Sequence, residues 1–220
     1  MSINLSKNEI KNKYELQYKN FNKIVKSDFL RKLMLYRYFV DNKEIHYLNS
    51  NISINEGLFL TDLIKKYKPK RLIEIGFACG ISTAFILLSI DKKSTLLSID
   101  PFQKFQWNSF GLKVVNNIIK ERNLTNDNHQ WIPLYSYKFF NNINKKVDFC
   151  FIDGDHSYEG TLIDLEGCNK ILEKNGILVI DDVLHIQVKK ALNNFMLKND
   201  KLYEKIQSEV KTMNAYKKLK

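Results

Sequence analysis

The sequence predicts a doubly wound α/β fold with a mostly parallel sheet, and three observations carry this prediction. Five short apolar runs follow one another after residue 70, at 71–75, 95–99, 130–135, 147–152 and 176–180. Amphipathic helix-like segments separate most of them, which is the order expected of a parallel sheet covered on both faces. The runs are apolar throughout and do not alternate, as is typical of strands that are buried on both faces.

The C-terminal tail contains two further strand-like pieces, near residues 202–206 and 213–217. An antiparallel hairpin that closes the sheet would suit them, which brings the expected number of strands to seven.

The N-terminal part is polar and rich in Lys and Asn, and one segment in it, residues 27–40, has a helical pattern. Ser27 or Asp28 can cap this helix, and its apolar residues fall on one face: Phe29, Leu30, Leu33 and Met34. No linker rich in Gly, Pro or Ser follows. We therefore expect residues 1–55 to form a helical extension or lid on a main domain of residues 56–220.

Composition indicates an intracellular globular protein. No apolar run reaches the length of a membrane span, and the N-terminus lacks the apolar core of a signal peptide. The three cysteines form no C-x-x-C pair and are expected to be buried thiols in the cytoplasm. The net charge of +11 comes from scattered lysines in a sequence rich in residues with A/T-rich codons, so it is weak support for a nucleic-acid partner.

A glycine-rich turn follows the first predicted strand in "RLIEIGFACGIST". Ala78 and Ile81 break the dinucleotide pattern G-x-G-x-x-G, and no phosphate-binding G-x-x-x-x-G-K-[ST] is present. The remaining E-x-G-x-x-x-G places Glu74 where it suits an ammonium group, and Asp100 ends the next strand, where an acid can accept both ribose hydroxyls. A tight turn without any ligand is the alternative.

This turn resembles the first motif of class I S-adenosylmethionine-dependent methyltransferases. The residues expected around the cofactor are Glu56, Glu74, Gly76, Phe77, Ala78, Gly80, Ser82, Thr83, Asp100, Ser136 and Asp153. Ser82 and Thr83 have a second interpretation, because they open the predicted helix after the turn and could simply cap it.

Acidic residues gather where the fourth and fifth predicted strands end. Asp153 ends "VDFCFI", and Asp181 and Asp182 follow "GILVI" about one strand–helix–strand unit later. Adjacent strands lie ~5 Å apart, so the three carboxylates can converge. Their mutual repulsion calls for a cation, and all-oxygen ligands favour Mg²⁺ or a similar ion.

The stretch "FIDGDHSYEGTLIDLEGCNKILEKNGILVIDDV" resembles the D-G-x-H-x-Y region of small O-methyltransferases, and is similar to sugar enzymes of the macrocin and novobiocin type, relatives of catechol O-methyltransferase. The resemblance covers residues 54–185 and implies a Rossmann-like, seven-stranded methyltransferase fold. It also implies Mg²⁺ bound by Asp153, Asp181 and Asp182, with Asp155 as general base. His156 is the rival base, because its ordinary pKa near 6.5 suits that role.

Both candidate bases also have structural interpretations, Asp155 as a cap for the helix that begins near Tyr158 and His156 as a residue that orients the loop. The predicted function is Mg²⁺-dependent O-methylation of a hydroxylated small molecule such as a sugar or glycan, by a protein that binds no membrane. Metal-independent methylation, nucleic-acid methylation and a non-enzymatic binding module are the alternatives, and a homodimer is compatible with the sequence. The loop Asp153–His156 lacks the [N/D]-P-P-[Y/F] pattern common in enzymes that methylate base amino groups.

Overall fold

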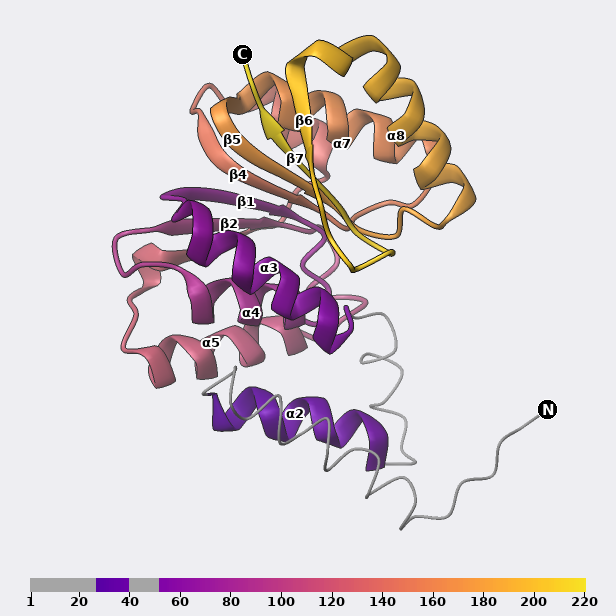
Figure 1. Ribbon diagram of the computed structural model, residues 1–220. Coiled ribbons are helices and arrows are strands. Elements are labelled where there is room, and N and C mark those ends of the chain that lie inside the picture. The colour runs from indigo at the N-terminus through magenta and orange to yellow at the C-terminus, as the bar shows by residue number, and fades with distance from the viewer. Residues whose placement is uncertain (1–26, 40–51) are drawn as a thin grey trace, which may run out of the picture.

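The computed structural model describes residues 27–39 and 52–220. Expectations for residues 1–26 and 40–51, which include most of the predicted extension or lid, lie outside the described residues. A single sheet runs through the middle of the molecule and carries layers of helices on both faces (Figure 1).

The elements alternate along the chain as the sequence predicts. The strands are β1 (Arg71–Ile75), β2 (Thr95–Ile99), β3 (His129–Ile132), β4 (Val147–Ile152), β5 (Leu172–Ile180), β6 (Tyr203–Ile206) and β7 (Asn214–Lys218). The helices are α2 (Asp28–Phe39), α3 (Ile54–Tyr67), α4 (Ile81–Ser89), α5 (Phe110–Arg122), α6 (Ser136–Asn142), α7 (Tyr158–Ile171) and α8 (Ile186–Asn199), with short 3-10 turns η2 (Asn126–Asn128) and η3 (Asp200–Leu202).

The sheet has seven strands in the order β3-β2-β1-β4-β5-β7-β6. Strands β1 to β5 are parallel, and β7 is antiparallel to both β5 and β6, so the predicted closing hairpin is confirmed. The chain winds outward from β1 to β3 and then restarts at β4 on the other side of β1. Open sheets of this kind bind ligands in the crevice where the strand order reverses.

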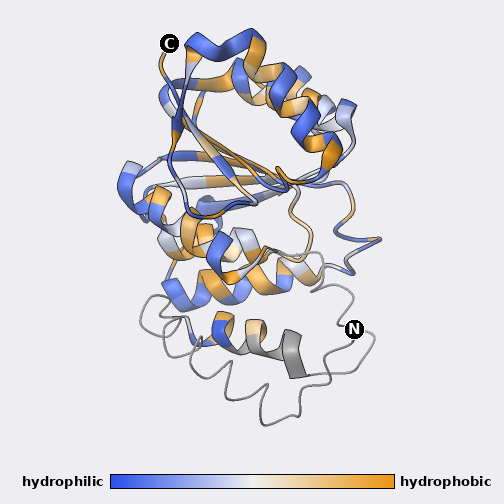
Figure 2. Ribbon diagram, turned by 45° about the vertical axis from the view of Figure 1, so that its right-hand side comes forward, coloured by the Kyte–Doolittle hydropathy of each residue, from blue (hydrophilic) through white to orange (hydrophobic). Residues whose placement is uncertain are grey.

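Successive residues of each inner strand serve opposite layers, which explains why these strands are apolar without alternation. Leu72 belongs to the core that α3, α4 and α5 cover, whereas Ile73 belongs to the core under α6, α7 and α8. The helices mix apolar and polar residues along their length, as amphipathic covering helices do (Figure 2).

Helix α2 confirms the helical prediction for residues 28–39. The Ser27 hydroxyl accepts a hydrogen bond from Leu30 N at 3.0 Å and donates one to the Glu121 carboxylate of α5 at 2.5 Å. Leu30 and Met34 are buried in the same core as α4 and α5. Helix α2 therefore packs against the main domain.

Strand β5 starts at Leu172, four residues before the predicted start, and two other boundaries differ from expectation for local reasons. Strand β3 ends at Ile132 and not at residue 135, because Pro133 has no N–H to continue the ladder. Helix α3 begins at Ile54 behind a capping box of Ser53 and Glu56, so the predicted domain boundary between residues 55 and 56 falls inside a helix.

The three cysteines are free and buried. Within the described residues, every helix is too short or too polar to cross a lipid bilayer.

A buried polar network lies beneath the glycine-rich turn and joins β1, β2 and α4. The Glu74 carboxylate is fully buried and accepts hydrogen bonds from Ser82 Oγ at 2.5 Å, Thr83 Oγ1 at 2.5 Å and Ser98 Oγ at 2.6 Å. His129 Nε2 lies 3.0 Å from the same Ser98 hydroxyl. Burial raises the pKa of Glu74 to about 7, although the three hydroxyls oppose the shift. Glu74 therefore links helix α4 to strands β1 and β2.

Glu74 makes stability depend on pH in a defined direction. Its folded pKa lies above the ordinary value of 4.5, so the folded state keeps a proton that the unfolded state has already lost as pH rises. Between about pH 4.5 and pH 7 this group should lower the free energy of unfolding by on the order of 3 kcal/mol.

We expect the free energy of unfolding of Glu74→Gln not to fall in this way as pH rises. Denaturant titrations of the wild type and the variant across that pH range measure the difference. Glu204→Gln, at an exposed position on β6, should follow the wild-type profile. A constant difference between wild type and Glu74→Gln over the range would mean that the pKa of Glu74 is not raised.

Candidate active site

The turn after β1 and the loop after β4 touch through their backbones. Gly76 has a φ of +89°, and a Cβ atom built on it would lie 1.9 Å from the carbonyl oxygen of Asp153. Only glycine fits such an approach, for reasons of both space and backbone conformation. The glycine-rich turn is thereby held beside the loop that carries Asp153, Asp155 and His156.

Asp100 fixes the conformation of the glycine-rich turn. Its carboxylate accepts hydrogen bonds from the backbone N–H groups of Phe77 at 3.2 Å and Ala78 at 2.7 Å. The other oxygen accepts from Phe102 N at 2.6 Å. Ala78 has a φ of 40°, which is uncommon for alanine, so these bonds stabilise a strained turn. A carboxylate has further lone pairs, and its binding to ribose hydroxyls stays a prediction.

A cavity of about 410 Å³ opens at the carboxyl ends of β1 to β4. This volume is in the range of small-molecule sites. The predicted residues in its wall are Gly76, Ala78, Asp100, Ser136, Asp153 and Asp155, and the other lining residues include Ile75, Phe102, Trp107, Leu134, Tyr135, Gly154 and Asp164. The strand ends of β1 to β4 that the sequence singled out converge on this cavity, whereas Asp181 and Asp182 after β5 are not among its lining residues.

Aromatic side chains form one side of this cavity. Phe102 is 41% exposed, and its ring contacts that of Tyr135 edge to face, with ring centroids 5.7 Å apart. Tyr135 in turn stacks on Tyr137. Exposed flat rings at the mouth of a pocket suit a planar ligand group.

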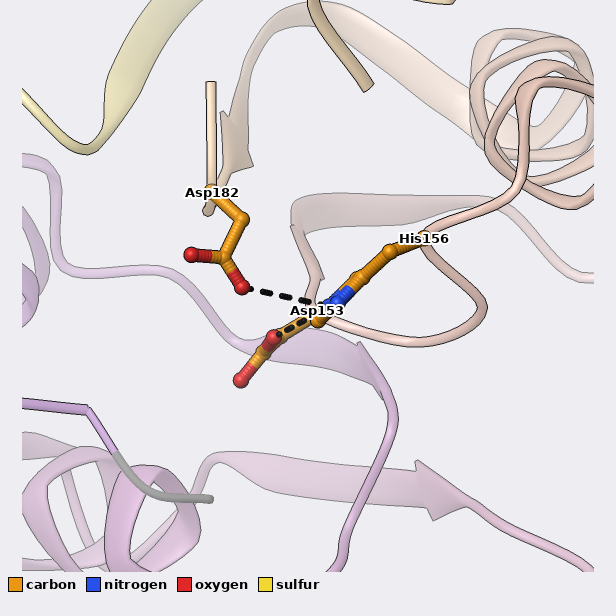
Figure 3. Close-up of side chains that lie close together, drawn as sticks. All are labelled: Asp153, His156 and Asp182. Atoms are coloured by element: carbon orange, nitrogen blue, oxygen red, sulfur yellow. Dashed lines mark hydrogen bonds and ion pairs between the residues drawn. The ribbon is translucent and has the colours of Figure 1, made fainter. Parts of the chain in front are cut away.

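An acidic cluster lies next to the cavity, where β4 and β5 end. Three side chains in it, Asp153, His156 and Asp182, each offer one possible ligand atom, and these atoms lie within 4.8 Å of one another. His156 Nε2 lies 3.3 Å from Asp153 Oδ1 and 3.2 Å from Asp182 Oδ2, and the imidazole points between the two carboxylates (Figure 3). The described structure thus brings together two of the three predicted metal ligands and adds His156.

The third predicted ligand, Asp181, is buried beside this group instead of within it. Its Oδ1 accepts a hydrogen bond from Asp182 N at 2.7 Å. Burial raises the pKa of Asp181, and the nearby charges of Asp153 and Glu56 add to the shift. Burial also raises the pKa of Asp153, against the opposing hydrogen bond from His156. These carboxylates are crowded, and in the described structure His156 offers them a partial counter-charge.

Glu56 borders a different hollow. Its carboxylate accepts hydrogen bonds from Ser53 N and from the Thr212 hydroxyl. It lines a cavity of about 850 Å³ between α3 and the loop of residues 207–212, and the first cavity does not include it. Loop 207–212 reaches the site, because Val183 N donates to Thr212 O at 2.9 Å.

Asp155 is exposed and engaged with the start of α7. It accepts hydrogen bonds from Ser157 N at 2.9 Å and Ser157 Oγ at 3.0 Å, while Ser157 itself caps the helix by accepting from Gly160 N. Asp155 also lines the cavity. Ser157 and not Asp155 is the N-cap of α7, so the cap interpretation of Asp155 is wrong, although Asp155 supports the capping residue. The position of Asp155 in the cavity wall allows contact with a ligand.

Five predicted cofactor residues besides Glu56 lie outside the cavity wall, namely Glu74, Phe77, Gly80, Ser82 and Thr83. Glu74 is satisfied by internal hydroxyls and cannot face an ammonium group in this conformation. Ser82 and Thr83 do not cap α4, and this interpretation is wrong. The helix begins at Ile81, and its N-cap residue, Gly80, has a left-handed conformation and no side chain to cap with, while both hydroxyls turn inward to Glu74.

Sequence reasoning missed Asp164, which is 1% exposed and lines the cavity from α7. A signal was present, because Asp164 falls on the helical face of Thr161, Leu165 and Cys168, which are all buried. An acid within a buried helical face is uncommon and indicates a special role.

Comparison with known proteins agrees with this architecture. The family model described as "Methyltransferase domain" matches residues 73–183, from β1 to the acids after β5. No curated protein is similar enough in sequence to count as a relative.

Several solved structures share the fold at low sequence identity. An O-methyltransferase from Bacillus cereus in complex with SAH is 16% identical, with a TM-score of 0.65 over 87% of this chain and 91% of that one. TomG from Streptomyces achromogenes, an O-methyltransferase of tomaymycin synthesis in complex with SAM, is 14% identical, with a TM-score of 0.65 over 88% and 91%. A methyltransferase from Geobacter sulfurreducens is 15% identical, with a TM-score of 0.68 over the full length of both chains.

The matched family region contains the glycine-rich turn, the cavity-lining strand ends and the acidic cluster. With a match over half of its residues and a seven-stranded sheet in the order of this fold, the chain belongs to the methyltransferase domain family.

Proposed function

We propose that the protein is an S-adenosylmethionine-dependent O-methyltransferase that acts on a hydroxyl group of a small molecule. One observation carries the proposal. Asp153 lines the cavity at the ends of β1 to β4, and the same side chain belongs to the acidic cluster at the ends of β4 and β5. A methyl donor in the cavity would therefore lie beside groups that can orient and deprotonate an acceptor.

The cavity fits the cofactor in size and in chemistry. Gly76 and Ala78 line it, Asp100 offers carboxylate lone pairs, and the aromatic side chains of Phe102 and Tyr135 belong to the same wall. S-adenosylmethionine supplies a methyl group activated by a sulfonium centre. The SAH and SAM complexes of similar folds support this assignment.

The acidic cluster fits a divalent cation. Two carboxylates and an imidazole can reach a common point. The pKa values of Asp153 and Asp181 are raised by burial and by neighbouring carboxylates, and a cation would relieve this repulsion. A donor set with one nitrogen suits Mn²⁺ or another transition ion as well as Mg²⁺. Such a cation would lower the pKa of an acceptor hydroxyl and orient it.

Within this chain, Asp155 is placed to accept the proton of the acceptor hydroxyl. It lines the cavity, and its hydrogen bonds to Ser157 hold the carboxylate in one orientation. His156 then holds the cluster together through its contacts with Asp153 and Asp182. Positioning of the two reactants supplies the remainder of the rate enhancement.

A sugar or another polyol is the acceptor class that we favour. The cavity between α3 and loop 207–212 carries hydroxyl and charged side chains, among them Ser53, Asp62, Lys66, Ser208 and Lys211, together with apolar ones such as Leu58, Phe59 and Val210. The polar groups offer hydrogen-bond partners to the hydroxyls of a sugar, and the apolar side chains can pack on the face of its ring.

A metal-independent enzyme is the second candidate, and one observation favours it. The His156 imidazole bridges Asp153 and Asp182, and its hydrogen bond with Asp153 raises the pKa of His156. A histidine held by two carboxylates can itself act as the base.

The first test is turnover. Purified protein with S-adenosylmethionine should release S-adenosylhomocysteine when a panel of hydroxylated acceptors, including free sugars, nucleotide sugars and catechols, is supplied. Release with sugars and not with catechols supports the favoured acceptor class, whereas methylation of RNA or DNA alone would contradict the proposal.

Asp100→Ala should weaken the binding of S-adenosylhomocysteine by at least about tenfold, because two backbone N–H groups of the turn and the ribose hydroxyls would lose their acceptor. Isothermal calorimetry measures the dissociation constant. Asp127→Ala, at an exposed position on η2, removes the same charge and should bind like the wild type. An unchanged dissociation constant in Asp100→Ala would contradict the assignment of Asp100 to the ribose hydroxyls.

The wild-type protein should bind one Mg²⁺ or Mn²⁺ ion per chain, and Asp182→Asn should weaken that binding by at least about tenfold. Calorimetric titration with each chloride salt reports this without any activity assay. Glu159→Gln removes an exposed charge three residues after His156 and serves as the control. Full turnover in EDTA, with no ion bound, would favour the metal-independent candidate.

Asp155→Asn should lower kcat by roughly a hundredfold or more, because general-base catalysis typically contributes that much, while S-adenosylhomocysteine and metal binding stay unchanged. His156→Asn should instead weaken metal binding. Steady-state kinetics with an acceptor from the panel, together with calorimetry, separates the two roles.

Ser157→Ala is the matched control for Asp155→Asn. It removes the hydrogen bonds between the Ser157 hydroxyl, Asp155 and the start of α7 but keeps the carboxylate. We expect only a small change in its kcat. If His156→Asn abolishes turnover while ion binding persists, and Asp155→Asn stays active, the base is His156.

A further inference from the structure

Asp164 is a buried acid that the mechanism above does not use. It lies on α7, is 1% exposed, and lines the cavity proposed for S-adenosylmethionine. Burial raises the pKa of Asp164 to about 7, and a hydrogen bond from the Ser136 hydroxyl partly opposes the shift. An acid in such a place is costly unless it binds something.

One oxygen of Asp164 lacks a partner. Among the described residues, no group donates a hydrogen bond to the buried Oδ1. Glu74, a buried acid of the same fold, accepts hydrogen bonds from three hydroxyls and shows that the protein can satisfy a buried carboxylate internally. A buried acceptor without a donor costs about 1–3 kcal/mol, so the free lone pairs of Asp164 Oδ1 indicate a donor that comes from a ligand.

Gly154 packs closely against the Asp164 carboxylate in the cavity wall. A Cβ atom at Gly154 would lie 3.1 Å from Asp164 Oδ2 and 3.0 Å from Ile75 Cγ2, so any side chain at this position would crowd the carboxylate. Ser136, also in the cavity wall, holds the carboxylate from the start of α6.

The same part of the cavity suits a planar ligand group. Leu134, Tyr135 and Ser136 follow β3 and line the cavity together with Asp164, and Phe102 packs edge to face on Tyr135. A flat ring beside these side chains would need a hydrogen-bond donor at its edge to satisfy Asp164. The exocyclic amine of adenine is such a donor.

We propose that Asp164 is a specificity-determining residue that accepts a hydrogen bond from the exocyclic amine of the purine base in the cavity. The inference rests on the proposed function, since it takes the ligand to be S-adenosylmethionine or its product. It assigns to α7 a contact that selects an amino-purine over a 6-oxo-purine, because a carbonyl oxygen at that edge would face a carboxylate oxygen.

The test compares the dissociation constants of S-adenosylhomocysteine and its deaminated analogue, S-inosylhomocysteine, by calorimetry. The wild type should bind the adenosyl compound at least about tenfold more tightly, since a site built for a donor rejects an acceptor. In Asp164→Asn the amide N–H can donate to the 6-oxo group, so the preference should fall below about threefold. Glu166→Gln, an exposed acid on the same helix, should keep the wild-type ratio.

The outcomes separate this inference from the proposed function. If the wild type binds neither compound, the cavity is not a S-adenosylmethionine site and both fail. If the adenosyl compound binds and Asp164→Asn keeps the wild-type ratio, only the role of Asp164 is overturned. If Asp164→Asn does not fold, the test uses the wild type and an analogue of S-adenosylhomocysteine whose purine has hydrogen in place of the amine. Binding about tenfold weaker than that of S-adenosylhomocysteine supports the proposal. Equal binding of the two compounds overturns it.

Discussion

The backbone contact between Gly76 and Asp153 is the constraint on which the rest of the site depends. It exists because β1 and β4, separated by two other strands in the sequence, are neighbours in the sheet. On one side of the contact lies the cavity at the ends of β1 to β4, and on the other lies the acidic cluster. The carbonyl of Asp153 touches the turn while its carboxylate joins the cluster, so a single residue couples the two.

Glu74, Asp164 and the half-buried Asp153 differ in how their carboxylates are satisfied. Glu74 accepts three hydroxyl hydrogen bonds and links β1 to β2 and α4. Asp153 and Asp182 both contact His156, and one oxygen of Asp164 accepts no hydrogen bond from any residue that the structure describes. Folding favours hydrogen-bond partners for every buried polar group, so a carboxylate with too few partners is a candidate contact for a ligand.

Several residues that the sequence assigns to ligand binding first serve the scaffold. Asp100 holds the glycine-rich turn, Ser82 holds Glu74, and Asp155 supports the start of α7. A turn that a carboxylate has already fixed needs no rearrangement to receive a ligand, which lowers the entropic cost of binding. Scaffold and binding roles are compatible because carboxylate oxygens can accept more than one hydrogen bond.

The sequence by itself determined the α/β class, the seven strands and the edge of the sheet that carries the site, because these follow from apolar runs and from polar residues at strand ends. It also placed Asp153 and Asp182 near each other, since the ends of adjacent parallel strands must meet. Only the tertiary structure decided which side chain joins them: His156 turns into the cluster, while Asp181 is buried beside it. The tertiary structure also decided the surroundings of two buried acids. Glu74 faces hydroxyls from α4 and β2, and Asp164 lines the cavity beside Gly154. Sequence pattern fixes the face of an element on which a residue lies, but the direction of a polar side chain depends on partners from other elements, and only packing brings those together.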